Sequence, residues 1–360
     1  MNWSTQVTQM LGVKYPIIQA PMFGVTTPEM VAAAAEAEAL GSLALGDLSG
    51  AACRAAIQRT QKLVKGPFAV NIFVNSIPEV SDALRGQYAK AKSAVERLAH
   101  QHDIAVDLPE FEDIKLTDYR EQVDAILENQ CKIVSFTFGN LDPESISRLK
   151  AAGTILIGTC TCTEEALILE QSGIDIICVQ GWEAGGHRGS FSALDIPQIG
   201  GLSLLAQVRD RVKLPLVYAG GIYNATTLLA AKQLGAEGFQ IGSLLLRSTE
   251  SALLDFEKQR LMQVKESDVV LTRSFSGRYA RGIKNIFIET MDTSGCILPY
   301  PYQNKLTNLL RKAAKIDNNV DFVSIWTGQS IHSYRDCSTR EIIRDLVEKV
   351  NIFDNTYHER

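Results

Sequence analysis

The sequence predicts an α/β protein built on a (β/α)8 TIM barrel, with a smaller, mostly helical second domain. Two observations predict the barrel: eight short apolar runs are typical of buried strands, and a segment long enough for a helix follows each. Eight consecutive strand–helix units favour closure over the competing architecture, an open doubly wound sheet. With 360 residues and 46% hydrophobic content, the chain can bury a large core in one or two domains.

The predicted strands are rich in β-branched and other apolar residues. In chain order they are Tyr15–Ala20, Ser42–Gly46, Phe68–Val74, Ile133–Phe138, Thr154–Gly158, Ile174–Gln180, Leu214–Ala219 and Gly238–Gly242. The helix expected after the first strand has a clear start signal, because Thr27 offers an N-cap, Pro28 suits the first helical position and Glu29 favours the first turn. Similar helical patterns begin at Thr163 and Asn224 after later strands.

Two segments are longer than a minimal barrel needs. Residues 75–132 separate the third and fourth strands, and residues 250–350 continue past the eighth. Long insertions at the active face of a barrel commonly form lids or substrate walls. We therefore expect a barrel of residues 1–74 and 133–249, with the two longer segments packed together as a lid or substrate domain. The alternative is that they only decorate the barrel.

Composition excludes several classes of function. The net charge of -5 and the absence of a long basic run argue against a nucleic-acid or membrane-surface role. The seven cysteines are scattered and odd in number, which is typical of reduced core thiols, and Cys160-Thr-Cys162 lacks the spacer of the usual zinc or redox pairs. We expect no metal site. The first residues do not resemble a signal peptide and no run of 18 apolar residues occurs, so the expected location is cytoplasmic.

The stretch of residues 180–189, Gln-Gly-Trp-Glu-Ala-Gly-Gly-His-Arg-Gly, carries the strongest functional signal. Its glycines allow close approach to a flat ligand, and they place His187 just past a strand end. Imidazole titrates near neutrality, so His187 is a candidate catalytic acid or base. The alternative is a glycine-rich turn whose histidine only hydrogen-bonds the backbone.

Two glycine sites follow the seventh and eighth strands. They comprise Gly220 and Gly221 in the first, and Gln240, Ile241, Gly242 and Ser243 in the second. Barrels often bind a phosphate at these two strand ends, because exposed backbone N–H groups supply donors there without a bulky side chain. A phosphorylated cofactor is therefore expected, although either glycine pair alone could be an ordinary turn.

The first and third strands offer groups suited to a planar heterocycle. Ala20, Pro21 and Met22 end the first strand, and Asn71 places an amide that donates and accepts within an apolar strand. Asn71 could instead satisfy neighbouring backbone, and core packing is the simpler expectation for Met22 and Phe23.

With these motifs the chain resembles the class I nitronate monooxygenases, formerly called 2-nitropropane dioxygenases, which are FMN-dependent (β/α)8 barrels. The resemblance runs almost end to end, and its Glu-Ala-Gly-Gly-His segment is typical of a small group of flavin barrels. The matching segments are Tyr15–Met22, Phe68–Phe73, Val134–Gly139, Val179–Gly189, Ala219–Ile222, Ser276–Gly282 and Trp326–Gln329.

The resemblance implies roles for individual residues. It makes His187 the active-site histidine beside FMN. It places Ala20, Pro21, Met22, Asn71, Gln180 and Gly185 along the isoalloxazine and ribityl chain, and Gly220, Gly221, Gly242 and Ser243 at the phosphate. The chain departs from the family pattern at three positions. Thr137 stands where some members carry a second histidine, Ser243 replaces a frequent threonine, and Ser330 replaces a usual glycine.

The implied reaction is oxidation of an alkyl nitronate by FMN through single-electron steps, with O2 as the final acceptor and a carbonyl compound and nitrite as products. His187 would act as a base on a neutral nitroalkane, or would orient a preformed nitronate. An anionic substrate also needs cationic neighbours, for which the sequence offers Arg188, Arg278, Arg281 and Lys305.

Two alternatives remain open at this point. A flavin-dependent enoyl-acyl carrier protein reductase shares the Gly-Gly-His turn, and it would oxidise NAD(P)H readily. A non-catalytic flavin-binding protein would consume no oxygen with nitronates.

Overall fold

The computed structural model describes residues 2–358, and the side chains of residues 2–353. Eight parallel strands form its centre, and all eight match strands predicted from the sequence. They are β1 (Ile17–Gln19), β2 (Gly41–Gly46), β3 (Phe68–Phe73), β4 (Ile133–Thr137), β5 (Ile155–Cys160), β6 (Ile176–Gln180), β8 (Leu216–Ala219) and β9 (Gly238–Ile241). Most of these strands are shorter than predicted. The strand β5 instead extends to Cys160, because Thr159 and Cys160 still pair with Cys178 and Val179 of β6.

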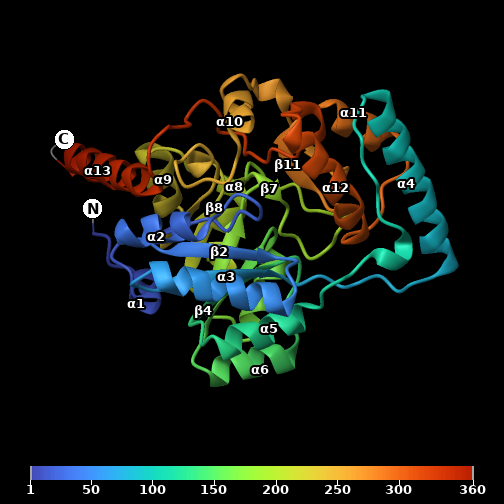
Figure 1. Ribbon diagram of the computed structural model, residues 1–360. Helices are drawn as coiled ribbons and strands as arrows, with labels where there is room; N and C mark the ends of the chain where they lie inside the picture. The colour runs from blue at the N-terminus through green and yellow to red at the C-terminus, as the bar shows by residue number, and fades with distance from the viewer. Residues whose placement is uncertain (1, 359–360) are drawn as a thin grey trace.

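The strands curve into a nearly closed barrel (Figure 1). Their order is β1-β9-β8-β6-β5-β4-β3-β2. The two edge strands meet where Ile18 and Leu40 form a parallel bridge, and the Gln19 N–H donates to the Leu40 carbonyl at 2.9 Å. The barrel predicted from the sequence is therefore confirmed.

Helices surround the barrel on its outer face (Figure 1). Their bounds are α2 (Pro28–Glu36), α3 (Gly50–Leu63), α5 (Tyr119–Glu128), α6 (Pro143–Ala151), α7 (Thr163–Gln171), α8 (Gly201–Arg211), α9 (Ala225–Gln233) and the C-terminal α13 (Thr339–His358). Two of the predicted caps are confirmed: the side chains of Thr27 and Asn224 accept from the backbone N–H groups of Met30 and Thr227. These caps fix where α2 and α9 begin after their strands. The start predicted at Thr163 is wrong as a cap, because Cys162 is the N-cap of α7 and makes no side-chain cap hydrogen bond, and Thr163 is already the first helical residue.

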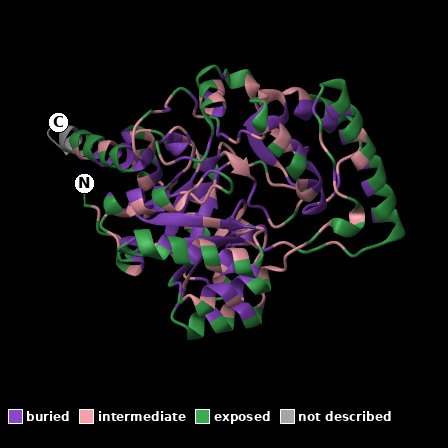
Figure 2. Ribbon diagram, viewed as in Figure 1, coloured by how far each residue is buried: buried purple, intermediate pink, exposed green. Residues whose placement is uncertain are grey.

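One end of the barrel is closed by α1 (Gln6–Leu11). Val7 and Leu11 of this helix form an apolar cluster with inward-facing strand residues such as Ile157 and Val217. Figure 2 shows the strands as the most buried part of the molecule, beneath helices whose outer faces are exposed. Because apolar side chains fill the α1 end, a ligand cavity has room only at the opposite end, where the strands finish.

A second apolar core lies beside the barrel. It joins side chains from residues 84–108 with side chains from residues 246–334, among them Tyr88, Phe275 and Phe287. Four helices contribute to it and gather on one side in Figure 1: α4 (Asp82–Gln101), α10 (Asp255–Met262), α11 (Ile286–Thr293) and α12 (Tyr302–Ile316). This shared core supports the proposal that the two long segments form one lid or substrate domain.

The last helix of each long segment packs on the barrel and not in the second core, which differs from the domain bounds expected from the sequence. Val123 and Ile126 of α5, and Ile343 and Val350 of α13, belong to the barrel core. Their apolar faces lie against α3 and against α2 and α9, respectively. Both helices therefore cover the barrel, because an amphipathic helix buries its apolar stripe wherever a complementary face is nearest.

A three-stranded antiparallel sheet was not anticipated from the sequence. It consists of β10 (Val269–Thr272), β11 (Ala280–Ile283) and the two-residue β7 (Gly186–His187), in the order β10-β11-β7. So short a strand leaves no alternating pattern to recognise. Short 3-10 turns lie at Phe111–Asp113, Ser243–Leu245, Glu266–Asp268 and Val320–Phe322.

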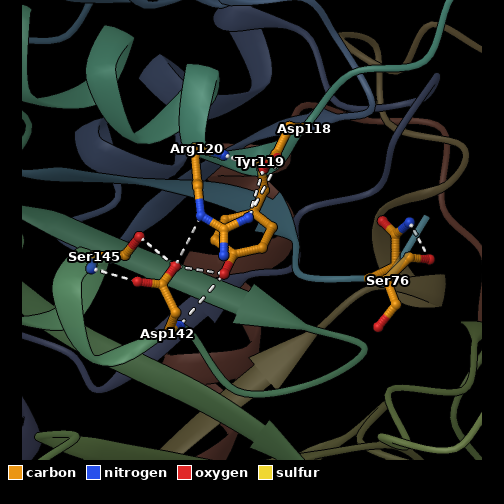
Figure 3. Close-up of polar contacts among 7 residues, drawn as sticks. Ser76, Asp118, Tyr119, Arg120, Asp142 and Ser145 are labelled. Atoms are coloured by element: carbon orange, nitrogen blue, oxygen red, sulfur yellow. Dashed lines mark hydrogen bonds and ion pairs between the residues drawn. The ribbon is translucent and has the colours of Figure 1, made fainter.

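A polar network fixes the loop that follows β4 (Figure 3). The Tyr119 hydroxyl donates to Asp142 Oδ2 at 2.6 Å, and the Ser145 N–H donates to Asp142 Oδ1 at 2.9 Å, which caps α6. Burial alone would raise the pKa of Asp142, but hydrogen bonds from Tyr119 and Ser145 outweigh it and hold the pKa at about 2. The ionised carboxylate therefore ties the loop between β4 and α6 to Tyr119 at the start of α5.

Candidate functional site

A cavity of about 450 Å³ opens at the carboxyl ends of the barrel strands. Its volume is in the usual range for small-molecule and cofactor sites. All but one of the predicted site residues line it: Ala20, Pro21, Met22, Asn71, Gln180, Gly185, His187, Gly220, Gly221, Gln240, Gly242 and Ser243. The exception is Ile241, whose side chain is buried in the barrel core and whose carbonyl accepts from the Ala20 N–H at 2.8 Å.

The two glycine sites form a cradle of backbone groups at one side of the cavity. Gly220 has a φ of 120° and Gly221 a φ of 69°, conformations that favour glycine. Their backbone N–H groups make no hydrogen bond to any residue that the structure describes. The hydroxyl of Ser243, across the cradle, accepts from the Gly328 N–H at 2.8 Å, so its own proton is free to donate.

The chain approaches itself closely at Gly185. A Cβ at this position would lie 2.4 Å from the Gly328 nitrogen, so only glycine fits there. The Gln329 N–H donates to the Glu183 carbonyl at 3.0 Å and fastens the same contact. The Trp326–Gln329 motif therefore holds the glycine-rich loop against the cradle.

Two amides face the cavity in different ways. Asn71 Nδ2 donates to Ser135 Oγ at 2.9 Å, and its Oδ1 remains available as an acceptor. Gln180 Nε2 donates to the His187 carbonyl at 3.0 Å, and its Oε1 accepts from the Gly189 N–H at 2.8 Å. Asn71 therefore offers an acceptor to a ligand, whereas Gln180 lines the cavity and also holds the histidine turn.

Contacts of both its backbone and its side chain fix His187. Its backbone pairs with Ala280 of β11, and its Nε2 lies 2.8 Å from Ser276 Oγ in the β10–β11 loop. The rings of Phe73 and Phe138 lie 6.1 Å and 5.5 Å from the imidazole, centroid to centroid. His187 therefore lies at the cavity beside the packed rings of Phe73 and Phe138, on a short strand rather than on a free turn.

Burial lowers the pKa of His187 to about 3, and the positive charges of Arg278 and Arg311 act in the same direction. We therefore expect the imidazole to stay neutral from pH 8 down to about pH 4. NMR titration of protein labelled with ¹⁵N-histidine measures this, with free N-acetylhistidine as the internal reference. Titration of the His187 signal together with the reference would contradict the expectation.

The four cations that the sequence offered as substrate ligands do not line the cavity, so that expectation is wrong. The guanidinium groups of Arg188, Arg278 and Arg281 donate to backbone carbonyls between residues 180 and 192. Lys305 pairs with Asp47 at 2.8 Å. The three arginines satisfy carbonyls of the loop that carries His187, which is a positioning role.

A polar wall of the cavity that the sequence analysis did not predict comes from α12. Asn304, Asn308, Arg311, Lys312 and Lys315 line the cavity. Their three- and four-residue spacing places them on one helix face, and this spacing was the available signal. Burial lowers the pKa of Arg311 to about 10, so its guanidinium stays charged at neutral pH.

Two aromatic residues line the cavity although the sequence analysis did not predict them there. Tyr300 is 5% exposed, and its buried hydroxyl has no hydrogen-bond partner among the described residues. Burial raises its pKa well above the usual range, so the hydroxyl keeps its proton. Because a buried donor normally has a partner, the Tyr300 hydroxyl is a candidate donor to an acceptor atom of a ligand.

Phe23, expected in the core, is 39% exposed and lines the cavity.

Among the described side chains, those of residues 2–353, no group of three or more histidine, cysteine, aspartate or glutamate residues is placed to hold a metal ion. Along residues 2–358, no helix has the length and apolar content needed to cross a membrane.

Comparison with known proteins identifies the family. The nitronate monooxygenase family model matches residues 4–349. A probable nitronate monooxygenase of Staphylococcus saprophyticus is 38% identical over 359 residues, which cover 98% of this chain and 99% of that protein. The chain belongs to the nitronate monooxygenase family. A second relative, a probable nitronate monooxygenase of Staphylococcus aureus, is 37% identical over 349 residues, with 96% and 97% coverage.

Solved structures agree with membership of this oxidoreductase family. The nitroalkane oxidase of Streptomyces ansochromogenes superposes with a TM-score of 0.88 at 32% identity, over 98% of this chain and all of that one. FabK of Thermotoga maritima superposes with a TM-score of 0.75 at 23% identity, over 99% of both chains. The second likeness shows that the nitronate monooxygenase barrel and that protein share a fold.

Proposed function

We propose that the protein binds FMN and oxidises alkyl nitronates with O2, giving a carbonyl compound and nitrite. The observation that carries the proposal is the cavity itself, which brings a cradle of unpaired backbone N–H groups and a neutral histidine to the same strand ends. Family membership and the likeness to a nitroalkane oxidase support the same chemistry.

The residues present fit the phosphate and ring of FMN. A Cβ at Gly242 would lie 3.4 Å from Ala20 Cβ and 3.7 Å from Met22 Sδ, so it would project into the space between the two walls. The N–H groups of Gly220 and Gly221 and the hydroxyl of Ser243 would hold the phosphate. Asn71 Oδ1 would accept from an N–H edge of the ring.

Bound FMN would supply the redox chemistry, by accepting electrons from the substrate carbon and passing them to O2. The chain's own groups bind and orient the substrate. The charged Arg311 on α12 would attract the anionic nitronate, and the Tyr300 hydroxyl would donate a hydrogen bond to it. The neutral His187 would accept a proton when the substrate arrives as a nitroalkane.

Tyr300→Phe is expected to lower kcat/KM for nitronates by about 10-fold or more, because a donor to a charged group is worth roughly 1.5–3 kcal/mol. Steady-state oxygen consumption measures the effect, and visible absorbance checks that flavin occupancy is unchanged. Tyr302→Phe is the matched control, since Tyr302 is buried against Phe111 and does not line the cavity. Unchanged kcat/KM in Tyr300→Phe would remove Tyr300 from the substrate site.

Oxygen consumption by the purified, FMN-loaded protein across a series of alkyl nitronates tests the proposal. Release of nitrite in step with oxygen uptake is expected. Rapid FMN reduction by NADH without turnover of nitronates would instead indicate an enoyl reductase, and absence of both activities would indicate a flavin-binding protein.

A further inference from the structure

The hydroxyl of Ser276 lies within hydrogen-bonding distance of both His187 and the backbone of Arg278. It lies in the β10–β11 loop, is 2% exposed, and lines the cavity beside His187. Its Oγ lies 2.8 Å from His187 Nε2, 3.0 Å from the Arg278 carbonyl oxygen and 3.3 Å from the Arg278 nitrogen. Three polar groups therefore converge on one hydroxyl that carries one proton.

The proton count selects one arrangement. Among the described residues, Ser276 is the only donor to the Arg278 carbonyl, and Arg278 is buried. If the hydroxyl proton went to His187 Nε2, this carbonyl would be left unpaired in the interior, which is costly. If the proton goes to the carbonyl, Ser276 Oγ can accept from both the Arg278 N–H and a protonated His187 Nε2. All of these groups are then satisfied.

We propose that Ser276 is a positioning residue that holds His187 in the tautomer with the proton on Nε2. Nδ1 then carries the lone pair, and no described group in residues 2–353 donates to it. Since His187 lines the cavity, Nδ1 is the ring atom left for a ligand. The ring is set to accept a proton rather than to donate one.

This tautomer bears on the substrate class, a consequence that rests on the proposed function. A neutral nitroalkane has an acidic C–H bond next to the nitro group. Nδ1 takes this proton, the C–H electron pair moves onto the nitro group, and the products are the nitronate anion and a histidinium. The anion formed in this step offsets the positive charges of the histidinium and of Arg311. A preformed nitronate has no proton to give, so it gains nothing from Nδ1. The tautomer therefore suits the proton-accepting role proposed above for His187 with a neutral nitroalkane.

NMR of the FMN-loaded protein labelled with ¹⁵N-histidine tests the tautomer without any turnover. Two-bond ¹H–¹⁵N correlations show which ring nitrogen is protonated, and the His187→Gln variant assigns the signals. The proposal predicts a protonated Nε2 in the wild-type protein and in Ser276→Thr, which keeps the hydroxyl, and a shift of the proton toward Nδ1 in Ser276→Ala. A protonated Nδ1 in the wild-type protein, or an unchanged tautomer in Ser276→Ala, would overturn it.

Kinetics supply the second arm of the test. Ser276→Ala is expected to lower kcat/KM about 100-fold for a neutral nitroalkane relative to its own nitronate, and Ser276→Thr to restore most of the loss. Ser274→Ala is the matched control, because Ser274 is buried in the same loop but bonds Thr272. An equal loss for both substrates would make Ser276 merely structural and overturn the proposal. If the wild-type protein oxidises neither substrate, the proposed function fails, whereas the NMR result still decides the tautomer.

Discussion

His187→Ala is expected to keep FMN bound and to lose most oxidation of nitroalkanes and nitronates, with kcat/KM falling by about 10²–10⁴-fold. The imidazole contacts the cavity but not the glycine cradle, so its removal leaves the phosphate donors in place. The effect should be larger for neutral nitroalkanes, which need a proton acceptor, than for nitronates, which need only orientation.

Flavin absorbance and oxygen consumption, measured on the same purified variant, separate binding from turnover. His100→Ala is the matched control, because His100 lies exposed near the end of α4. Undiminished turnover in His187→Ala would show that the histidine has no catalytic role, and loss of FMN from this variant would show that it holds the cofactor instead.

Gly242→Leu is expected to weaken FMN binding by at least about 100-fold, equivalent to ~2.7 kcal/mol. A Cβ at Gly242 already reaches contact distance of Ala20 and Met22, and the rest of a leucine side chain would occupy the cradle between β9 and β1. The backbone φ of Gly242 is negative, at -123°, and a Cβ there meets its neighbours at ordinary contact distances, so the protein should still fold. The loss should therefore appear in binding rather than in stability.

Titration of the flavin-free variant with FMN, followed by quenching of flavin fluorescence, measures this affinity, and thermal unfolding checks the fold. Gly86→Leu makes the same exchange on α4, where a Cβ would meet nothing within 4 Å. Wild-type FMN affinity in Gly242→Leu would place the phosphate elsewhere in the cavity.

The parts of the site that could be predicted are those with a local signal. Apolar runs marked all eight strands, and glycines at the ends of β8 and β9 marked the cradle, because each requirement acts on a few consecutive residues. His187 was found for the same reason, since its glycine-rich context follows directly from β6.

The parts that could not be predicted depend on contacts far along the chain. Ser276 meets His187 across 89 residues of sequence, and Tyr300 and Arg311 reach the cavity from a segment beyond the barrel. The cations were chosen wrongly because an arginine in a motif looks the same whether it meets a substrate or a backbone carbonyl. Burial decides between the two, and Arg188 and Arg278 are buried against the carbonyls of the His187 loop.

We propose that one cavity brings a flavin and a nitronate together beside His187. Anaerobic mixing of the FMN-loaded protein with an alkyl nitronate, followed by the visible absorbance of the flavin, tests it most directly. Rapid bleaching by the nitronate is expected, at a rate that saturates with nitronate concentration and is far slower in His187→Ala. A flavin that stays oxidised with every nitronate, but is bleached rapidly by NADH, would contradict it.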